Sequence, residues 1–270
     1  MNYRHAFHAG NHADVLKHLT LLLLLDALQK KDKPLLILDT HGGRGLYDLK
    51  EGQATEGILK LRAEGTTAPA PVRALLEATR RGSGRHYPGS PKLVADRLRP
   101  QDRLIACELN PEESRALKSR VRGPRCRIEQ ADGWQAIRTH LPPSERRALI
   151  LIDPPYERPD EFQRIERGLR DGLARLATGV FALWYPIKDR APVAGLHRRI
   201  VALTDRPILR AEMGIWPESP GNRLNGSGML IVNPPWQLDE RLGESLPWVH
   251  ERLRRDARAQ WRLDWLTPDS

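Results

Sequence analysis

The chain has 270 residues, of which 40% are hydrophobic and 29% are charged, a balance that is typical of globular domains and argues against a disordered or fibrous protein. Its formal net charge of +10 favours a polyanionic partner, most simply nucleic acid, although charge alone would also fit a soluble basic protein. The two cysteines, Cys107 and Cys126, lack metal-ligand spacing and give no sign of a disulfide framework, which fits a reducing cytoplasm.

The first predicted helix follows an irregular, histidine-rich arm at residues 1–10. Asn11 is a suitable N-cap for a helix that we expect to reach about Lys31. Its leucine-rich run at 19–25 resembles a signal-peptide core, but the run is too short to span a bilayer, Asp26 interrupts it, and no small-residue cleavage site is evident. We therefore expect a buried helix in a soluble, unexported protein that does not associate with membranes.

A short apolar segment at 35–38 predicts a buried strand that runs directly into a glycine-rich turn at 39–45. This combination opens many nucleotide-binding folds. Dinucleotide-binding enzymes share it, but their acidic residue should lie about 20 residues beyond the glycines, whereas the candidate here, Glu108, lies much further along. No Walker-type Gly-Lys-Ser/Thr sequence occurs, which disfavours a P-loop phosphotransferase.

The segment 46–90 interrupts this pattern. Two helical stretches, near 55–64 and 71–81, flank a turn that is rich in threonine, alanine and proline. Because the α/β alternation resumes beyond them, we expect one domain over residues 1–270 with a small helical subdomain inserted at 46–90. The insertion would also account for the distance between the glycine turn and Glu108.

Strands and helices alternate through the rest of the chain, which implies a parallel sheet with right-handed crossovers. The sequence therefore predicts an α/β protein with a Rossmann-like, mostly parallel sheet of about seven strands, followed by a basic helical tail at 248–266. The further strands are expected at 104–107, 126–129, 148–152, 180–185 and, as the last, 229–232.

Polar groups follow four of these strands, at the edge where an open α/β sheet binds its ligands. The glycine turn, which includes His41 and Gly43, lets the backbone approach a ligand closely. Glu108 can accept hydrogen bonds from both hydroxyls of a ribose, and Asp132, which precedes Gly133, can accept one from an adenine amino group. This order matches the cofactor site of a methyltransferase, with the fourth strand end facing the reacting centre.

The fourth strand ends in the sequence Asp-Pro-Pro-Tyr at 153–156. Two prolines cannot continue a sheet ladder, so they stiffen the turn and direct the Asp153 carboxylate and the Pro154 carbonyl at one point, beside the flat face of Tyr156. These groups suit an exocyclic amino group on a planar base. The sequence resembles the (Asp/Asn)-Pro-Pro-(Tyr/Phe/Trp) motif of amino-methyltransferases, which use S-adenosylmethionine, although Asp-Pro after a strand is also a plain turn signal.

A second copy of the pattern, Asn-Pro-Pro-Trp at 233–236, also follows an apolar strand. This copy comes after the last predicted strand, and no cofactor-binding run precedes it. We therefore assign a structural role to Asn233 and the catalytic role to Asp153.

Histidines are concentrated near the start of the chain. Their spacing is loose and no cysteine is near, so we expect no bound metal. Lys17 and His18 lie on the first predicted helix, whose cap directs them toward the ligand end of the sheet. Five of the nine histidines fall in the first 41 residues: His5, His8, His12, His18 and His41.

Nearly the whole chain resembles the RlmJ family of bacterial 23S ribosomal RNA adenine-N6 methyltransferases. The resemblance implies a Rossmann-like core with an inserted helical subdomain, S-adenosylmethionine as cofactor, and N6-methyladenosine in 23S rRNA as product. The segments 46–85 and 189–225 are least alike. The segments that carry the resemblance are 3–18, 38–41, 87–91, 131–133, 149–156, 182–186 and 233–236.

The resemblance also assigns roles to single residues. Catalysis falls on Asp153, with Pro154 and Tyr156 beside it, and the N-terminal motif places three more residues near the active site: Tyr3, His5 and Lys17. Arg44 departs from the family pattern, which has a small residue there; the flanking glycines should preserve the turn. Cofactor contacts fall on His18, His41, Ser90, Glu108, Asp132, Gly133 and Asp153, to which the glycine turn adds Gly43.

Alternatives remain open on the sequence. The same chemistry could act on DNA adenine or on a protein glutamine, which the basic charge disfavours, or the chain could be a non-catalytic RNA-binding assembly factor, against which the Asp153 motif argues. We expect a cytoplasmic monomer that acts on 23S rRNA, free or early in assembly. Candidate phosphate contacts, each of which could instead be a solvated surface charge, are Arg62, Arg73, Arg80, Arg81, Arg85, Arg252, Arg254, Arg255 and Arg258.

Overall fold

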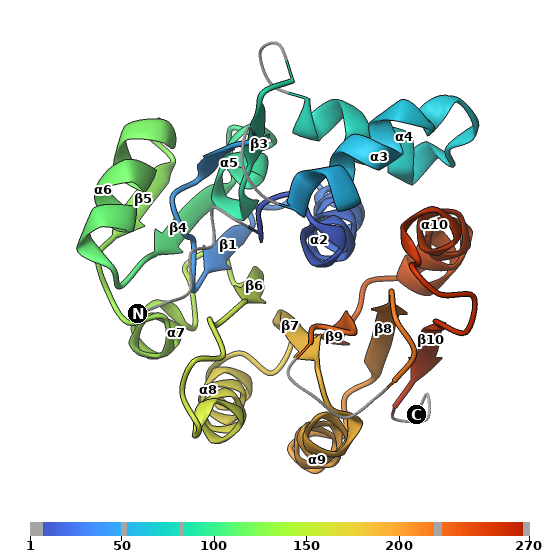
Figure 1. The fold of residues 1–270 in the computed structure, drawn as a ribbon. Coiled ribbons are helices and arrows are strands. Elements are labelled where there is room, and N and C mark those ends of the chain that lie inside the picture. The colour runs from blue at the N-terminus through green and yellow to red at the C-terminus, as the bar shows by residue number, and fades with distance from the viewer. Residues whose placement is uncertain (1–7, 50–52, 81–83, 219–222, 267–270) are drawn as a thin grey trace.

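The computed structural model describes residues 8–49, 53–80, 84–218 and 223–266. Its centre is an eight-stranded sheet in the order β10-β8-β9-β7-β6-β1-β4-β5 (Figure 1). The strands are β1 (Leu36–Asp39), β4 (Arg103–Cys107), β5 (Cys126–Glu129), β6 (Ala148–Ile152), β7 (Val180–Ile187), β8 (Ile208–Gly214), β9 (Gly226–Val232) and β10 (Trp261–Trp265).

Most of the sheet is parallel, which confirms the predicted fold class. Strands β5, β4, β1, β6 and β7 all run in one direction. Strand β9 is antiparallel to both β7 and β8, so β8 runs in the same direction as β7, and β10 is antiparallel to β8. The carboxyl ends of β1, β4, β6, β7 and β8 therefore share one edge of the sheet, and the first residues of β9 and β10 lie at that same edge.

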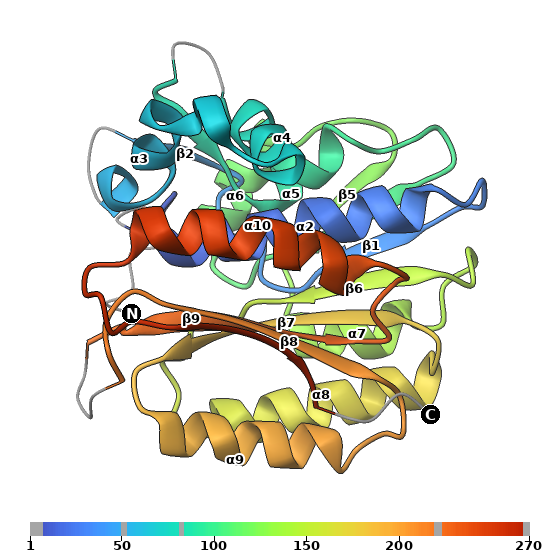
Figure 2. The ribbon, with the colours of Figure 1, turned by 90° about the vertical axis from the view of Figure 1, so that its right-hand side faces the viewer.

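Helices cover both faces of the sheet (Figures 1 and 2). Each face has its own hydrophobic cluster, and neighbouring strand residues alternate between them: Ile37 belongs to one cluster, Leu36 and Leu38 to the other. One face carries α2 (His12–Gln29), α5 (Ser90–Ala95), α6 (Pro111–Arg120) and α10 (Leu238–Leu253). The other carries α7 (Gly133–His140), α8 (Glu161–Arg175) and α9 (Arg190–Val201).

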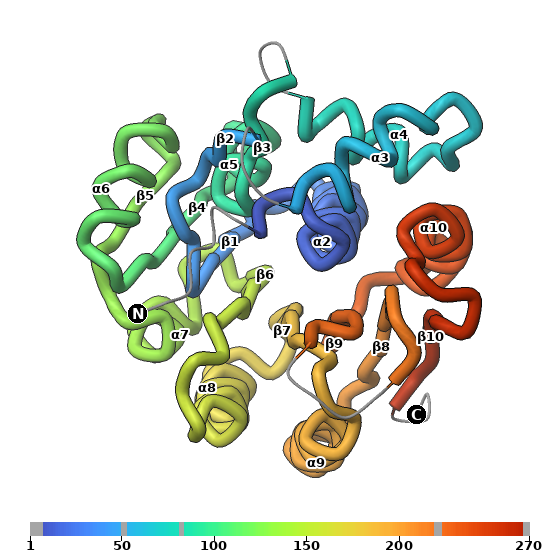
Figure 3. Tube along the Cα trace, in the orientation of Figure 1, coloured from blue at the N-terminus to red at the C-terminus, as the bar shows by residue number. Residues whose placement is uncertain are grey.

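Helix α2 is a core helix, as the sequence predicts. The Asn11 side chain accepts hydrogen bonds from the backbone N–H groups of Ala13 and Asp14, at 3.0 Å each, and so caps the helix. Every residue from His12 to Leu25 is buried, because α2 lies between the sheet, α4 (Ala70–Thr79) and α10 (Figure 3). Among the described helices, none has the length and apolar character needed to cross a membrane.

The segment 46–90 contains short helices close to the predicted stretches, together with a small antiparallel pair of strands that the sequence did not reveal. The pair, β2 with β3, joins the two ends of the segment. The interpretation of 46–90 as an inserted subdomain stays a prediction. The elements are β2 (Leu46–Asp48), a 3₁₀ turn (Gln53–Glu56), α3 (Ile58–Ala63), a second 3₁₀ turn (Gly65–Thr67), α4 and β3 (His86–Pro88).

One prediction about the C-terminal third is wrong. The sheet has eight described strands, close to the expected number of about seven, although β8 was not among the predicted strands. The tail at 248–266 is not one helix: α10 ends at Leu253, and the alternating sequence Trp-Arg-Leu-Asp-Trp forms the edge strand β10. Its charged residues, Arg262 and Asp264, made the segment read as a polar helix, whereas alternating charge is a common feature of edge strands.

Candidate active site

Three acidic residues lie together at the carboxyl edge of the central strands. Asp39 is the last residue of β1, and it pairs in register with Ala106 of β4 on one side and Leu151 of β6 on the other. Glu108 and Asp153 follow those two flanking strands, so they lie on either side of Asp39. The predicted order of strand ends therefore places these three carboxyl groups at one edge.

Lys17 from helix α2 reaches this edge and pairs with Asp153. Its Nζ lies 2.5 Å from Asp153 Oδ2 and 2.8 Å from Asp14 Oδ1, one helical turn before it. Burial alone would lower the pKa of Lys17, but Asp14 and Asp153 raise that pKa well above its ordinary value. Asp153 is thus held in a buried ion pair with Lys17.

The turn after β6 holds its aromatic residue rigidly. Tyr156 has a φ of 53°, in the left-handed region that a non-glycine residue adopts only when its surroundings fix it. Its hydroxyl donates a 2.6 Å hydrogen bond to the carbonyl of Trp184 on β7. Its ring meets those of Trp184 and Phe162 edge-on, with centroids 5.6 and 5.9 Å away. Stacking of a base on Tyr156 stays a prediction.

The carboxylate of Glu108 is hydrogen-bonded to the backbone of the glycine turn. Gly43 donates its backbone N–H to Glu108 Oε2 at 2.9 Å, and Asn110 donates to Oε1 at 2.8 Å. Burial raises the pKa of Glu108, and these two donors act against that shift. Because a carboxylate oxygen can accept more than one hydrogen bond, ribose hydroxyls could also bind here. Gly43 has a φ of +59°, and a Cβ there would lie 2.2 Å from the Tyr47 hydroxyl, so only glycine fits.

The side chain of Arg44 points out of the glycine turn and binds an acidic residue of α6. Its Nε and Nη2 bind the two carboxylate oxygens of Glu113 on α6, at 2.9 and 2.6 Å. The planar guanidinium is therefore oriented along α6 by a two-point contact. The flanking glycines, Gly43 and Gly45, both keep positive φ angles, so the turn survives as expected.

Asp132 and Gly133 have structural tasks as well as their predicted one. Asp132 Oδ1 caps α7 by accepting from the backbone N–H groups of Trp134 and Gln135, and Oδ2 accepts from Arg164 at 3.0 Å. A Cβ on Gly133 would lie 2.2 Å from the Thr40 carbonyl oxygen, so glycine lets α7 approach the end of β1. Contact of these two residues with a cofactor stays a prediction.

Asp39 is the most deeply buried acid of the site. Burial raises its pKa to about 6, although a hydrogen bond from Ser90 opposes the shift. Oδ1 accepts from the backbone N–H of His41 at 3.3 Å, and Oδ2, also buried, has no hydrogen-bond partner among the described residues. An acceptor of this kind fits a ligand that brings its own donor.

Two histidines line the same edge. His18 Nδ1 lies 2.7 Å from the hydroxyl of Tyr87, which ties α2 to β3. His41 Nδ1 lies 2.8 Å from Thr40 Oγ1, and burial lowers the pKa of His41 to about 4, so its ring is neutral at physiological pH. Tyr3 and His5, which the sequence also assigned to the site, lie outside the described residues.

The edge therefore offers a row of hydrogen-bond acceptors: Asp39 Oδ2, the two oxygens of Glu108, and Asp153. This set fits a ligand that carries hydroxyl donors and positive charge, as S-adenosylmethionine does. Within the part of the chain that the structure describes, no group of three or more histidine, cysteine or acidic side chains could hold a metal ion.

The second Pro-Pro motif lies at the opposite edge. Strand β9 is antiparallel to β7, and Val232 at its end pairs with Phe181 near the start of β7. Asn233 Nδ2 donates to the carbonyls of Ala177 and Gly179, at 2.9 and 2.8 Å. These contacts agree with the structural role assigned to Asn233, and the distance along the strands keeps it away from Asp153.

Three residues of the site were not among the predicted ones. The contact of Asp14 with Lys17 could have been predicted, because Asp14 lies three positions before Lys17 and so on the same face of the helix. Asp39 lay within the predicted turn without a role of its own. Trp184 gave no signal, because its place beside Tyr156 depends on how far β7 extends past β6.

The candidate phosphate contacts differ in their surroundings. Arg62 donates to the carbonyls of Thr79 and Gly84, and Arg73 to that of Ala68, so both stabilise the segment 46–90 itself. Arg81 lies outside the described residues, while Arg80 and Arg85 are exposed. The tail arginines each have an acidic partner: Arg252 with Glu64, Arg254 with Glu251, Arg255 with Glu56 and Arg258 with Asp256.

Comparisons with known proteins agree with this geometry. A family model described as "Ribosomal RNA large subunit methyltransferase D, RlmJ" matches residues 32–267. The chain is 40% identical to "Ribosomal RNA large subunit methyltransferase J" of Escherichia coli (strain K12) and 36% identical to the protein of that name in Haemophilus influenzae, over the full length of each. A crystal structure of a Legionella pneumophila protein has a TM-score of 0.88 at 32% identity, covering 95% of this chain and 98% of that one.

Proposed function

The chain belongs to the RlmJ family of ribosomal RNA large subunit methyltransferases, and we propose that it transfers a methyl group from S-adenosylmethionine to the N6 amino group of an adenine in 23S rRNA. The observation that carries the proposal is the Asp153 carboxylate. It lies at the end of β6, beside the cofactor-type strand ends, and is paired with the buried Lys17 at 2.5 Å.

The cofactor, when bound, supplies a methyl group on a positively charged sulfur. Asp39, Glu108 and the glycine turn would hold it, because their free acceptors face the edge at which α/β sheets bind ligands. The neutral ring of His41 adds no positive charge that would repel the sulfonium. Lys17, a cation, is compensated by two carboxylates and so leaves the site open to a second positive charge.

The adenine amino nitrogen is a poor nucleophile, because its lone pair is delocalised into the ring. The Asp153 carboxylate accepts one of its N–H bonds and the Pro154 carbonyl accepts the other, which localises the lone pair on nitrogen. The nitrogen would then take the methyl group of the bound cofactor, the sulfur would leave as a neutral thioether, and the proton lost from the amino group would pass to solvent. Most of the rate comes from positioning, so Asp153 need not be a strong base.

The acceptor must be a base that has left its stack. Asp153 is largely buried, so a base within a duplex cannot reach it without being turned out. Tyr156, fixed by Trp184 and Phe162, offers the flipped base an aromatic surface. An unstacked base is most accessible in RNA that is free or at an early stage of assembly, and we propose 23S rRNA in that state as the substrate. We also propose that the chain acts as a cytoplasmic monomer.

The test is a methylation assay with radiolabelled S-adenosylmethionine and unmodified 23S rRNA. Wild-type protein should place label in RNA as N6-methyladenosine, and Asp153→Ala should abolish it while the fold, followed by circular dichroism, survives. Trp236→Ala is a matched control, because it alters the second Pro-Pro motif at the opposite edge, and it should be fully active.

Other outcomes separate the alternatives. Label in duplex DNA but not in RNA would identify a DNA adenine methyltransferase. Measurable cofactor binding without label in either nucleic acid would redirect the search to a protein or ribosomal-particle substrate. Failure to bind the cofactor at all would favour a non-catalytic assembly factor, and full activity of Asp153→Ala would refute the assigned role.

A further inference from the structure

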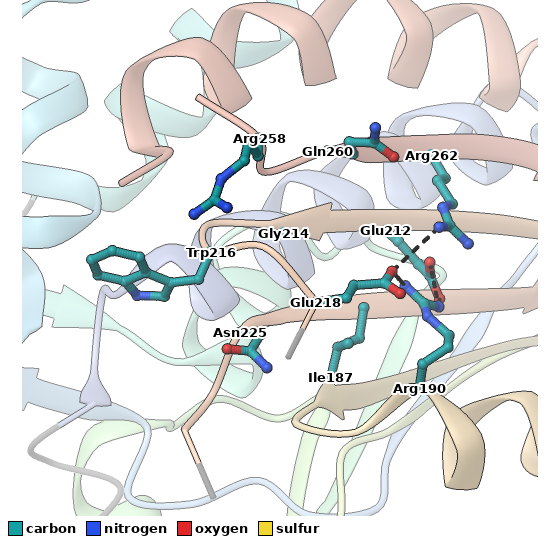
Figure 4. Close-up of a pocket in the computed structure, with 10 residues that line it drawn as sticks. All are labelled: Ile187, Arg190, Glu212, Gly214, Trp216, Glu218, Asn225, Arg258, Gln260 and Arg262. Atoms are coloured by element: carbon teal, nitrogen blue, oxygen red, sulfur yellow. Dashed lines mark hydrogen bonds and ion pairs between the residues drawn. The ribbon is translucent and has the colours of Figure 1, made fainter. Parts of the chain in front are cut away.

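A cavity of about 240 Å³ lies where strands β7 and β8 end and strands β9 and β10 begin (Figure 4). Ile187 ends β7 and Gly214 ends β8, while Asn225 and Gln260 immediately precede β9 and β10. All four residues line the cavity. Because β9 and β10 run opposite to β7 and β8, these ends and starts share the edge of the active site.

A continuous wall connects the cavity with the active site. Ile152, the last residue of β6, pairs with Leu183, and β7 continues four residues further, to Ile187, paired with β9 throughout. The first of these residues, Trp184, accepts the hydrogen bond from Tyr156. The last, Ile187, lines the cavity. A strand of substrate that leaves the active site past Tyr156 therefore meets the cavity within a few residues of β7.

The two ends of the cavity differ in chemistry. Trp216, Arg258 and Asn225 lie at one end (Figure 4). The guanidinium of Arg223 lies 4.3 Å from the centre of the Trp216 ring, and its Nε also donates to Asn225 Oδ1 at 3.4 Å. Arg223 therefore covers one face of the Trp216 ring, and an unpaired base would have to stack on the other face.

The other end is a fixed ion-pair cluster. Arg190 Nη1 donates to both carboxylate oxygens of Glu212, at 2.8 Å each, and Arg190 and Arg262 both pair with Glu218. Glu212 is fully buried and also accepts from the Tyr185 hydroxyl at 2.8 Å. These contacts hold the cluster in place without a ligand and leave Glu218, partly exposed, as an acceptor facing the cavity.

Arginines continue from the cavity toward the first helix. Arg255 donates its backbone N–H to Ile215, next to Trp216, and its side chain pairs with Glu56 at 2.7 Å. Arg255 also lies close enough to His12, at the start of α2, to contribute to the lowered pKa of that histidine, which burial chiefly causes. Arg255 thus places one cation, paired with Glu56, between the cavity and the start of α2.

We propose that this cavity binds one unpaired nucleotide of the RNA, near the target adenine in the sequence, with the base inside the cavity and its phosphate at Arg258. The inference rests on the proposed function. The volume is below the roughly 300–1,000 Å³ of pockets for larger small molecules, and it suits a single planar base. Glu212 and Glu218 disfavour a phosphate inside, whereas Arg258, with 79% of its side chain exposed, stands at the rim.

The experiment compares two variants with two matched controls in the full-length protein. Trp216→Ala removes the platform and Arg258→Ala the rim cation. The control Trp236→Ala removes a tryptophan that is 84% exposed at the opposite edge, and Arg170→Ala removes an exposed arginine of α8 that is paired with Glu166 just as Arg258 is paired with Asp256. Filter binding gives the Kd for transcribed 23S rRNA, and methylation kinetics give KM and kcat.

Trp216→Ala and Arg258→Ala should each raise the Kd and the KM for RNA roughly tenfold, in line with the loss of one base stack or one phosphate contact, while kcat and cofactor affinity stay within about twofold. The two controls should match wild type. Unchanged cofactor affinity also shows that Trp216→Ala has folded, and Arg258→Ala tests the same site without disturbing the core.

The two possible failures are distinct. If wild type methylates 23S rRNA but both cavity variants bind and methylate it like the controls, the cavity has no part in binding and the inference is overturned, while the proposed function stands. If wild type binds the cofactor but neither binds nor methylates RNA, the proposed function fails and the inference fails with it.

Discussion

The ammonium of Lys17 lies 2.5 Å from the carboxylate of Asp153, although 136 positions separate the two residues in the sequence. Both are largely buried, and Asp14 Oδ1 binds the same ammonium at 2.8 Å. A buried charge is stable only when it is paired, so the three residues form one electrostatic unit. The unit connects the core helix α2 with the proposed catalytic turn after β6.

Replacing Lys17 with Met should therefore cost both stability and activity. The variant leaves two buried carboxylates without their cation, which should lower the free energy of unfolding by about 3–5 kcal/mol, as measured by urea denaturation. Methylation should fall at least a hundredfold, because the Asp153 carboxylate would lose the ammonium that holds it in place. Lys17→Arg keeps the charge and serves as the control; equal stability of Lys17→Met and wild type would refute the pairing.

Asp14 should act on Asp153 only through Lys17. Asp14→Asn keeps the size of the side chain and an acceptor for the Gly10 N–H, which Asp14 Oδ2 binds at 2.9 Å, but it removes one charge. We expect a double-mutant cycle of Asp14→Asn with Lys17→Met to give a coupling energy of about 1–3 kcal/mol in unfolding free energy. A coupling energy near zero would show that the two residues act independently.

Asp39 should make the protein less stable as the pH rises from about 4 to about 6. Its folded pKa is raised to about 6 from an ordinary 3.8, so the folded state retains a proton that the unfolded chain has already lost in this range. Stability falls through that window and levels off above it, by about 3 kcal/mol in total for a shift of this size.

The variant Asp39→Asn tests this sign. The unfolding free energy that the variant gains over wild type should grow between pH 4 and pH 6 and then stay constant. At pH 7.5 this gain corresponds to a Tm that is higher by roughly 5 °C. Asp205→Asn, at an exposed position, is the control and should show no such trend. If the stability gain were instead largest at pH 4, its pH dependence would have the wrong sign, and burial of Asp39 could not be the cause.

Two substitutions of Tyr156 should distinguish the role of its hydroxyl, which anchors the turn, from that of its ring, on which a base would stack. Tyr156→Phe keeps the ring but leaves the Trp184 carbonyl without its 2.6 Å donor, so unfolding free energy should drop by about 1 kcal/mol with a modest effect on kinetics. Tyr156→Ala also removes the aromatic surface and should raise the KM for RNA tenfold or more. If both variants lose activity equally, the hydroxyl rather than the ring carries the function.

The sequence predicts those parts of the site in which an acidic residue directly follows a strand. Asp39, Glu108 and Asp153 each follow an apolar run, and parallel strands bring such ends to one edge, so local sequence was sufficient. Asp132 shows the limit of this reasoning. An aspartate before a helix is equally a ligand or an N-cap, and the structure shows the cap, with its second oxygen already bound to Arg164.

Long-range pairing could not be read in this way. The Lys17–Asp153 contact depends on where α2 crosses the sheet, and the cavity near Trp216 depends on the order β10-β8-β9-β7. Strand β10 is different, because its alternating sequence is a local strand pattern that was overlooked beside the preceding helix. The Lys17–Asp153 contact and the cavity follow from how distant elements pack rather than from any local pattern.

Arg44 gives a sharp contrast with its neighbour Gly43. The Arg44 guanidinium is held by Glu113 at 2.9 and 2.6 Å, outside the turn, so Arg44→Gly should leave cofactor affinity within about twofold and cost only about 0.5–1 kcal/mol, as a partly exposed ion pair does. Gly43→Ala should abolish cofactor binding, because its φ of +59° is strained for alanine and the new Cβ would lie 2.2 Å from the Tyr47 hydroxyl. Calorimetric titration with S-adenosylmethionine measures both affinities. A large loss in Arg44→Gly would mean that the arginine itself contacts the cofactor, and full affinity in Gly43→Ala would mean that the turn is not its binding site.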